Sequence, residues 1–218
     1  MKIKWYGHSA FLITADQGLK IITDPYESGA YGGALAYGKI KDQADVATTS
    51  HDHADHNDTQ SLPGAPQILK GIGSKSVKGM VFKGIPTYHD PSKGSERGAN
   101  TIFTFSVDGM QVCHLGDLGH ILSDQEVAEI GTVDILLIPV GGYYTIDPKE
   151  ATRVAEQIKP KVLIPMHFKT EKCGFPIAPV EDFLEGKANV KRPKSSEVSL
   201  DKRTLPQQME IVVLEHAL

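Results

Sequence analysis

Short runs of apolar or alternating residues recur along the chain and are separated by glycine, proline and aspartate. Such runs predict many short strands. A continuous apolar run at 133–140 is typical of a strand covered on both faces, and Asp108-Gly109 is typical of a hairpin turn. The predicted strands are 2–6, 10–14, 19–23, 44–50, 67–69, 80–82, 84–88, 101–107, 110–115, 133–140, 161–165 and 208–214.

Helix start signals occur in the second half of the chain. Ser123 followed by Glu126 forms a capping box and predicts a helix that runs to about residue 130. Asp147 before Pro148 predicts a longer helix that ends before Pro160, and a short helix is expected from about residue 179. Strands with occasional helices place the chain in the α/β class.

Two long segments show no clear periodicity of hydrophobic residues. The segment 27–41 is rich in glycine and contains two tyrosines. Because a loop this long within a compact domain is often functional, it is interpreted either as a wall or lid over a site, or as an irregular excursion. The polar segment 90–100 is expected to be a surface loop.

A cluster of residues that can bind metal lies directly after the predicted strand 44–50. His51, His53, Asp55 and His56 fall within six positions, in the pattern H-x-H-x-D-H. Residues two apart on a strand or tight turn point the same way, so His51 and His53 can converge on one ion. Asp55 and His56 fit a turn that leads into a helix and can face a second ion. A solvated polar turn is the alternative, but neutral imidazole with carboxylate favours a metal site.

This motif resembles that of the metallo-β-lactamase superfamily, and the chain continues the superfamily pattern with His89, Asp117 and His167, each after an apolar run. The segment 5–11, Trp-Tyr-Gly-His-Ser-Ala-Phe, and the Thr-Asp-Pro turn at 23–25 resemble the branch that contains L-ascorbate-6-phosphate lactonase and N-acylphosphatidylethanolamine phospholipase D. The resemblance implies a four-layer αββα sandwich and a single domain over residues 1–218.

The resemblance also implies a binuclear metal centre. One ion is expected at His51, His53 and His89, the other at Asp55, His56 and His167, with Asp117 bridging both. Zinc or manganese suits these ligands best, and iron or nickel is possible. A water held between two cations loses a proton near neutral pH, so hydroxide is the expected nucleophile, which Asp55 helps to orient or deprotonate. His114 is the main alternative to His89 as a ligand.

Other polar residues near these motifs are candidates for catalysis or binding. His8 is interpreted as a general acid or oxyanion binder, or else as a structural hydrogen-bond donor. Asp24 and His114 are expected to lie behind the ligands and orient them, although Asp24 also fits an ordinary turn. The expected substrate contacts are Arg97, Asn100, His120 and Tyr143.

Composition narrows the function further. The 218 residues carry a net charge of −4, which gives no electrostatic argument for a nucleic-acid partner. The two cysteines suggest no disulfide framework, and no signal-peptide or membrane-spanning run is present. The prediction is a cytoplasmic hydrolase of a small phosphodiester, phosphorylated lactone or ester. A di-iron redox protein and a non-catalytic metal-binding module are the alternatives. The sequence does not indicate an oligomeric state.

Overall fold

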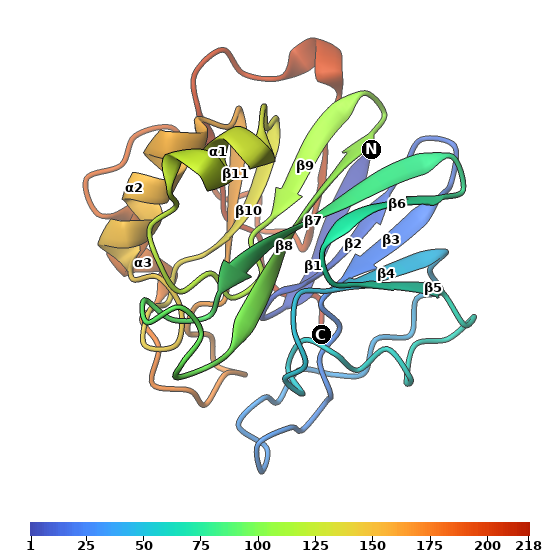
Figure 1. Cartoon of the computed structure of the whole chain (residues 1–218), viewed down its shortest axis with the longest axis horizontal. Helices are drawn as coiled ribbons and strands as arrows, with labels where there is room; N and C mark the ends of the chain where they lie inside the picture. Colours follow the sequence, from blue (N-terminus) through green and yellow to red (C-terminus); the bar gives the residue numbers. More distant parts are fainter.

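The computed structural model describes residues 1–218 as two mixed β-sheets packed face to face (Figure 1). The first sheet has six strands in the order β13-β1-β2-β3-β4-β5. Strands β1, β2 and β3 pair antiparallel, whereas β3, β4 and β5 pair parallel, so β1, β3 and β4 run in the same direction. The bounds are β1 Lys2–Gly7, β2 Ala10–Thr14, β3 Lys20–Thr23, β4 Val46–Thr49, β5 Gln67–Lys70 and β13 Glu197–Ser199.

The second sheet has eight strands in the order β12-β14-β11-β10-β9-β8-β7-β6. Strands β6 to β9 pair antiparallel, and β9, β10, β11, β14 and β12 pair parallel, so β7, β9 and β11 share one direction. The bounds are β6 Gly73–Val77, β7 Met80–Tyr88, β8 Ala99–Val107, β9 Met110–His114, β10 Ile135–Pro139, β11 Val162–Met166, β12 Val190–Lys191 and β14 Glu210–Val212.

Three α-helices lie together on one side of the molecule, near β10 and β11 (Figure 1). Helix α1, Asp124–Ile130, and helix α2, Pro148–Ile158, both begin at the predicted capping boxes. Helix α3, Val180–Leu184, is a single short turn, and a 3-10 turn follows at Lys202–Thr204. None of these helices has both the length and the apolar character that spanning a bilayer requires.

The outer face of the six-stranded sheet is covered by loops rather than by helices. A second cluster of buried side chains packs Tyr6, Leu12 and Ile22 of the sheet against residues between positions 26 and 62, including Leu35 and Tyr37. The main core of 44 buried residues draws on both sheets and on the three helices. The predicted sandwich is therefore present, but the layer that covers the six-stranded sheet consists of loops in place of helices.

The sequence reading missed some local structure. Residues 80–82 and 84–88 belong to one strand, β7, and the preceding strand β6 was not predicted, because its polar sequence is almost fully exposed at the sheet edge. The short strands β12 and β13 were also missed. No helix follows the histidine-rich stretch; residues 51–56 form bends and a turn.

Candidate metal centre

The strand directions explain why distant polar residues meet. His89, Asp117 and His167 follow β7, β9 and β11, which run in the same direction in the eight-stranded sheet. His8, Asp24 and His51 follow β1, β3 and β4, which share a direction in the other sheet. Because the carboxyl ends of equally directed strands lie at the same edge, the two sheets bring both groups of side chains to one end of the sandwich.

One cluster is formed by three imidazoles. The ligating nitrogens of His51, His53 and His89 all lie within 4.8 Å of one another, and His51 Nε2 is 3.0 Å from His53 Nδ1. Burial lowers the pKa of His51 to about 3, with a further contribution from His56. The imidazole of His51 is therefore neutral, which is the form that binds a metal ion.

A second cluster lies beside the first. Its ligand atoms belong to His8, Asp55, His56 and His167, again within 4.8 Å of one another. The rings of His51 and His56 are only 4.3 Å apart between centroids, so the two clusters are adjacent. These are the residues expected for the second ion, with His8 in addition.

Asp117 lies between the two clusters. Its Oδ2 atom is 3.2 Å from His89 Nε2, 3.2 Å from His56 Nε2 and 3.3 Å from His167 Nε2. Burial alone would raise the pKa of this carboxyl, but the three histidines hold it well below its usual range. One carboxylate oxygen thus faces imidazoles of both clusters, as a bridging ligand requires.

The donor set fits divalent cations. His56 Nε2 and Asp117 Oδ1 are both buried and make no hydrogen bond, and His56 Nε2 and the carboxylate of Asp117 face each other. Buried polar atoms without partners are rare in folded proteins, and a bound ion is one of the few things that satisfies them. Imidazole nitrogens with carboxylate oxygens are ligands that zinc, manganese and iron accept.

Neighbouring groups turn the ligand imidazoles toward the centre. Asp24 accepts hydrogen bonds from His56 Nδ1 at 2.8 Å, from the Ser50 amide at 2.8 Å and from the Ser50 hydroxyl at 2.5 Å. His51 Nδ1 donates to that hydroxyl at 2.9 Å, and His89 Nδ1 donates to the Tyr144 carbonyl at 3.1 Å. Each of these histidines therefore directs its Nε2 toward the centre. Asp24 lies where the sequence reading expected it.

The two uncertain histidines both point away from solvent. His114 uses both ring nitrogens, since Nε2 donates to the Ser9 carbonyl and Nδ1 accepts from the Gly116 amide, so it has none left for a metal. His8 is fully buried, and its Nε2 lies 3.0 Å from Asp55 Oδ2. Burial, with a contribution from His167, lowers the pKa of His8 to about 4. His8 thus contacts Asp55 and is not among the residues that line the cavity described below, and its role as a general acid or as a structural donor stays a prediction.

A cavity of about 330 Å³ opens above the centre. Its floor consists of predicted ligands, which are His53, Asp55, His89, Asp117 and His167. Its rim consists of aromatic and charged residues, which are Tyr31, Glu96, Arg97, Tyr144 and Phe175. The volume suits a small molecule.

Of the four predicted substrate contacts, only Arg97 lines this cavity. Asn100 is buried behind Asp117, and its side-chain amide bridges Thr87 Oγ1, the Leu115 carbonyl and the Asp117 amide. His120 is held by the Ile121 carbonyl and the Tyr88 amide outside the cavity. Tyr143 is 65% exposed and packs against Tyr144. The prediction that Asn100, His120 and Tyr143 contact the substrate is therefore corrected, because none of them lines the cavity.

Four cavity residues were not among the predicted site residues: Tyr31, Glu96, Tyr144 and Phe175. Tyr31 comes from the glycine-rich loop 27–41, whose interpretation as a wall over the site agrees with this position, and its hydroxyl donates to Asp55 Oδ1 at 2.9 Å. Tyr144 neighbours the predicted Tyr143, and the alternation of side chains alone did not decide which of the two faces inward. Phe175 follows Gly174 in an irregular segment, and no local pattern indicates its role.

Comparison with known proteins agrees with this geometry. A family model described as a beta-lactamase superfamily domain matches residues 2–167, which is most of the chain. The chain belongs to the beta-lactamase superfamily. Curated relatives include a UPF0173 metal-dependent hydrolase from Carboxydothermus hydrogenoformans, 33% identical over 78% of this chain and 85% of that protein. One from Archaeoglobus fulgidus is 33% identical over 78% of this chain and 84% of that protein.

A solved structure extends the comparison over nearly the whole chain. It is the crystal structure of a proposed zinc-dependent hydrolase of the metallo-beta-lactamase superfamily from Thermotoga maritima. The two chains are 38% identical, each is covered over 98% of its length, and the TM-score is 0.82. The superfamily fold inferred from the histidine-rich motif is therefore confirmed.

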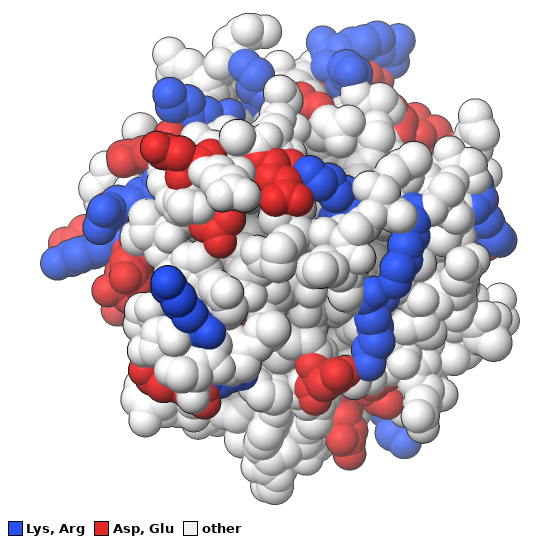
Figure 2. Space-filling view, in the orientation of Figure 1, with Lys and Arg blue, Asp and Glu red and all other residues white.

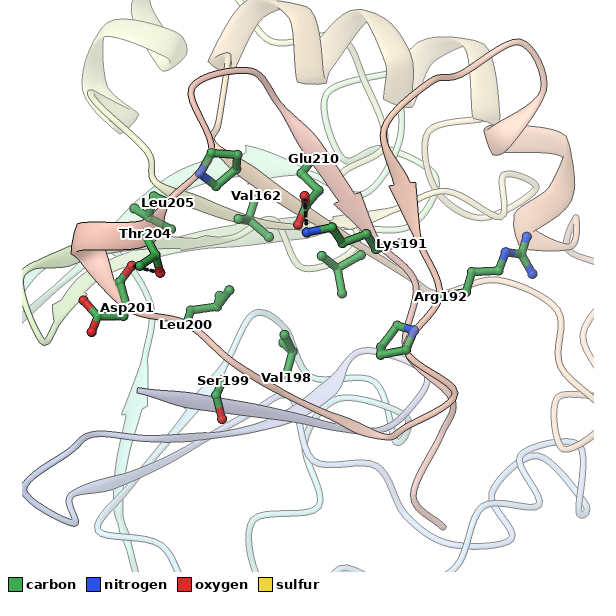
Figure 3. A pocket seen from close by; sticks show the side chains of 13 residues that line it. Val162, Lys191, Arg192, Val198, Ser199, Leu200, Asp201, Thr204, Leu205 and Glu210 are labelled. Atoms are coloured by element: carbon green, nitrogen blue, oxygen red, sulfur yellow. Dashed lines mark hydrogen bonds and ion pairs between the residues drawn. The ribbon is translucent and has the colours of Figure 1, made fainter.

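Size alone would not locate the site in this superfamily member. A larger cleft of about 540 Å³ lies between β13 of one sheet and β12 and β14 of the other (Figure 3). Lys191 and Glu210 in this cleft are already joined as an ion pair at 2.7 Å, and the cleft contains none of the candidate metal ligands. The face shown in Figure 2 mixes acidic and basic side chains without one large patch of a single sign.

Proposed function

We propose that this chain is a metal-dependent hydrolase that binds two divalent cations, most readily zinc or manganese, and cleaves a small ester. The observation that carries the proposal is the position of Asp117. One oxygen of this buried carboxylate lies 3.2–3.3 Å from imidazole nitrogens of both histidine clusters. The names of the curated relatives and of the Thermotoga maritima protein agree with a hydrolase.

In this proposal the chain's own residues hold the ions and orient the substrate. His51, His53 and His89 would hold one cation, Asp55, His56 and His167 would hold the other, and Asp117 lies between the two groups. When bound, such a pair of cations supplies Lewis acidity that lowers the pKa of a water molecule and polarises the oxygen of the scissile bond.

Asp55 has a second task in the proposed reaction. Its Oδ1 accepts a hydrogen bond from Tyr31, and its Oδ2 contacts His8, so the carboxylate is held in one orientation at the cavity floor. A carboxylate fixed in this way can accept a proton from an attacking water and direct that water toward the substrate.

The substrate is proposed to be a phosphodiester, a phosphorylated lactone or a related small ester. Two adjacent cation sites suit phosphorus–oxygen chemistry, because a pair of ions can contact the attacking and the leaving oxygen together. Arg97 at the rim adds a guanidinium that matches the geometry of a phosphate or carboxylate. The proposed partner is therefore a small molecule.

The test combines elemental analysis with a chromogenic phosphodiester assay and an ester assay on the purified protein. We expect about two metal ions per chain. Hydrolysis should be lost after chelation and restored by zinc or manganese. Tightly bound metal without turnover on either substrate class would instead support a metal-binding module, and bound iron with oxidase activity would support a redox protein. Hydrolysis that persists after chelation would refute the proposal.

A further inference from the structure

One wall of the cavity is aromatic. Tyr31, Tyr144 and Phe175 line it side by side, with Phe175 in the middle: its ring centroid is 5.4 Å from that of Tyr31 and 5.7 Å from that of Tyr144. Both pairs are edge-to-face, an arrangement that keeps aromatic rings in defined orientations. This wall comes from three separate loops, and none of its three residues is a candidate metal ligand.

Tyr31 is exposed yet held in place. The residue is 52% exposed to solvent. Its hydroxyl is anchored on Asp55 Oδ1 at 2.9 Å, so the ring stands over the cavity with a free face. A ring that is fixed at one end and open on its face is a preformed stacking surface.

Arg97 lies beside this wall, next to Tyr144. Its guanidinium carbon is 5.9 Å from the centre of the Tyr144 ring, and its closest acidic group, Glu96, is 3.6 Å away and mostly exposed. An ion pair this exposed to solvent contributes little to the stability of the fold, so the guanidinium can bind another anion. Arg97 also lines a neighbouring polar cavity, of about 440 Å³, that contains Lys70.

The loop that carries Arg97 is rigidly attached beside the metal centre. Asp90 accepts hydrogen bonds from four backbone amides of this loop, those of Ser92, Gly94, Glu96 and Arg97, at 2.8–3.1 Å. These hydrogen bonds hold the backbone of Arg97 in place before any ligand binds, as an anion-binding residue requires.

We propose that the substrate of this enzyme is an aryl ester of an oxyanion, in which an aromatic ring adjoins an anionic group. The ring packs against Tyr31, Tyr144 and Phe175, and Arg97 holds the charge. The inference rests on the proposed hydrolase function and narrows its substrate class. The size of the cavity favours a compact molecule, since a volume of about 330 Å³ has room for one ring and one anionic group.

The test uses phenylphosphonate, which carries the ring and the charge but no ester bond to hydrolyse. Its affinity for the metal-containing protein is compared with that of methylphosphonate by calorimetric titration. Both probes offer the same oxygens to the metal ions and to Arg97. The ratio of the two affinities therefore measures the contribution of the aromatic ring. We expect phenylphosphonate to bind about tenfold more tightly.

Variants then assign the two contacts. Phe175→Leu and Tyr144→Leu should each bring the affinity ratio close to one while the affinity for methylphosphonate stays the same. Tyr144→Leu keeps the backbone carbonyl that contacts His89, so metal content should not change. Arg97→Gln should weaken both probes equally. Tyr88→Leu and Arg192→Gln are the matched controls, because both residues lie outside this cavity.

The outcomes separate this inference from the proposed function. Equal affinity for the two probes, or a ratio that neither aromatic variant changes, would overturn the aromatic contact even if the protein hydrolyses other esters. A tenfold ratio that is lost in the variants, in a protein that hydrolyses no ester, would leave the binding preference intact and refute the hydrolase. Circular dichroism and metal content verify that each variant is folded.

Discussion

At the scale of single residues, Asp117 has the most demanding position. It is almost fully buried, and a lone buried carboxylate is costly unless opposite charges surround it. Three imidazoles approach one of its oxygens, while the other oxygen makes no hydrogen bond. Bound cations would satisfy both the charge and the free oxygen.

Asp117→Asn should therefore reduce metal binding. The amide keeps the size of the side chain but loses the charge and offers only one oxygen, so we expect metal affinity to fall at least about a hundredfold. Elemental analysis after dialysis checks this, together with the hydrolysis assay. His120→Ala is the control, because His120 lies outside the cavity and should retain metal and activity. Full metal content in Asp117→Asn would contradict the bridging role.

At the scale of elements, loops at the ends of strands carry the chemistry. The loop after β7 is organised by a single carboxylate, that of Asp90, which accepts four backbone amides. The same loop begins with the ligand His89 and carries Arg97 to the rim. The Asp90 side chain thus fixes the position of the loop that carries Arg97 relative to the candidate metal centre.

Asp90→Asn should loosen this loop without removing a ligand. Two of the four hydrogen bonds would be lost because the amide nitrogen cannot accept, and the other two would lose their charged acceptor. We expect KM for an anionic substrate to rise about tenfold while kcat changes less. Steady-state kinetics measures the split, and metal content should be unchanged. Asp201→Asn is the matched control, since Asp201 accepts the Arg203 amide far from the cavity. A fall in kcat alone would argue against a positioning role.

At the scale of the whole molecule, the centre joins the two sheets. His51, His53, Asp55 and His56 follow a strand of the six-stranded sheet, whereas His89, Asp117 and His167 follow strands of the other. Cations bound between them would connect the halves of the sandwich at one end, in addition to the shared apolar core.

Metal removal should therefore lower the thermal stability. A ligand present at a hundred times its Kd stabilises the folded state by about 2.7 kcal/mol, and in a chain of this size that corresponds to a Tm shift of roughly 5–10 °C. Calorimetry with and without a chelator measures the shift, and added zinc or manganese should reverse it. The Asp117→Asn protein should respond less to the chelator. An identical Tm for both forms would mean that no cation links the sheets.

The sequence by itself determined the fold class and the candidate ligands. Four metal-binding residues within six positions are recognisable because their convergence depends only on a turn, and His89, Asp117 and His167 each follow a strand that its apolar pattern reveals. Capping boxes likewise marked the starts of α1 and α2, since a cap involves only neighbouring residues.

Only the tertiary structure decided which side chains face the cavity. Asn100, His120 and Tyr143 are near the motifs in sequence but point elsewhere, whereas Phe175 is remote and lies at the rim. The direction of a side chain on a loop depends on contacts with segments far along the chain. Only the loop 27–41 was indicated as a possible wall by the sequence. The three aromatic residues meet because the two sheets bring their loops to the same end of the sandwich.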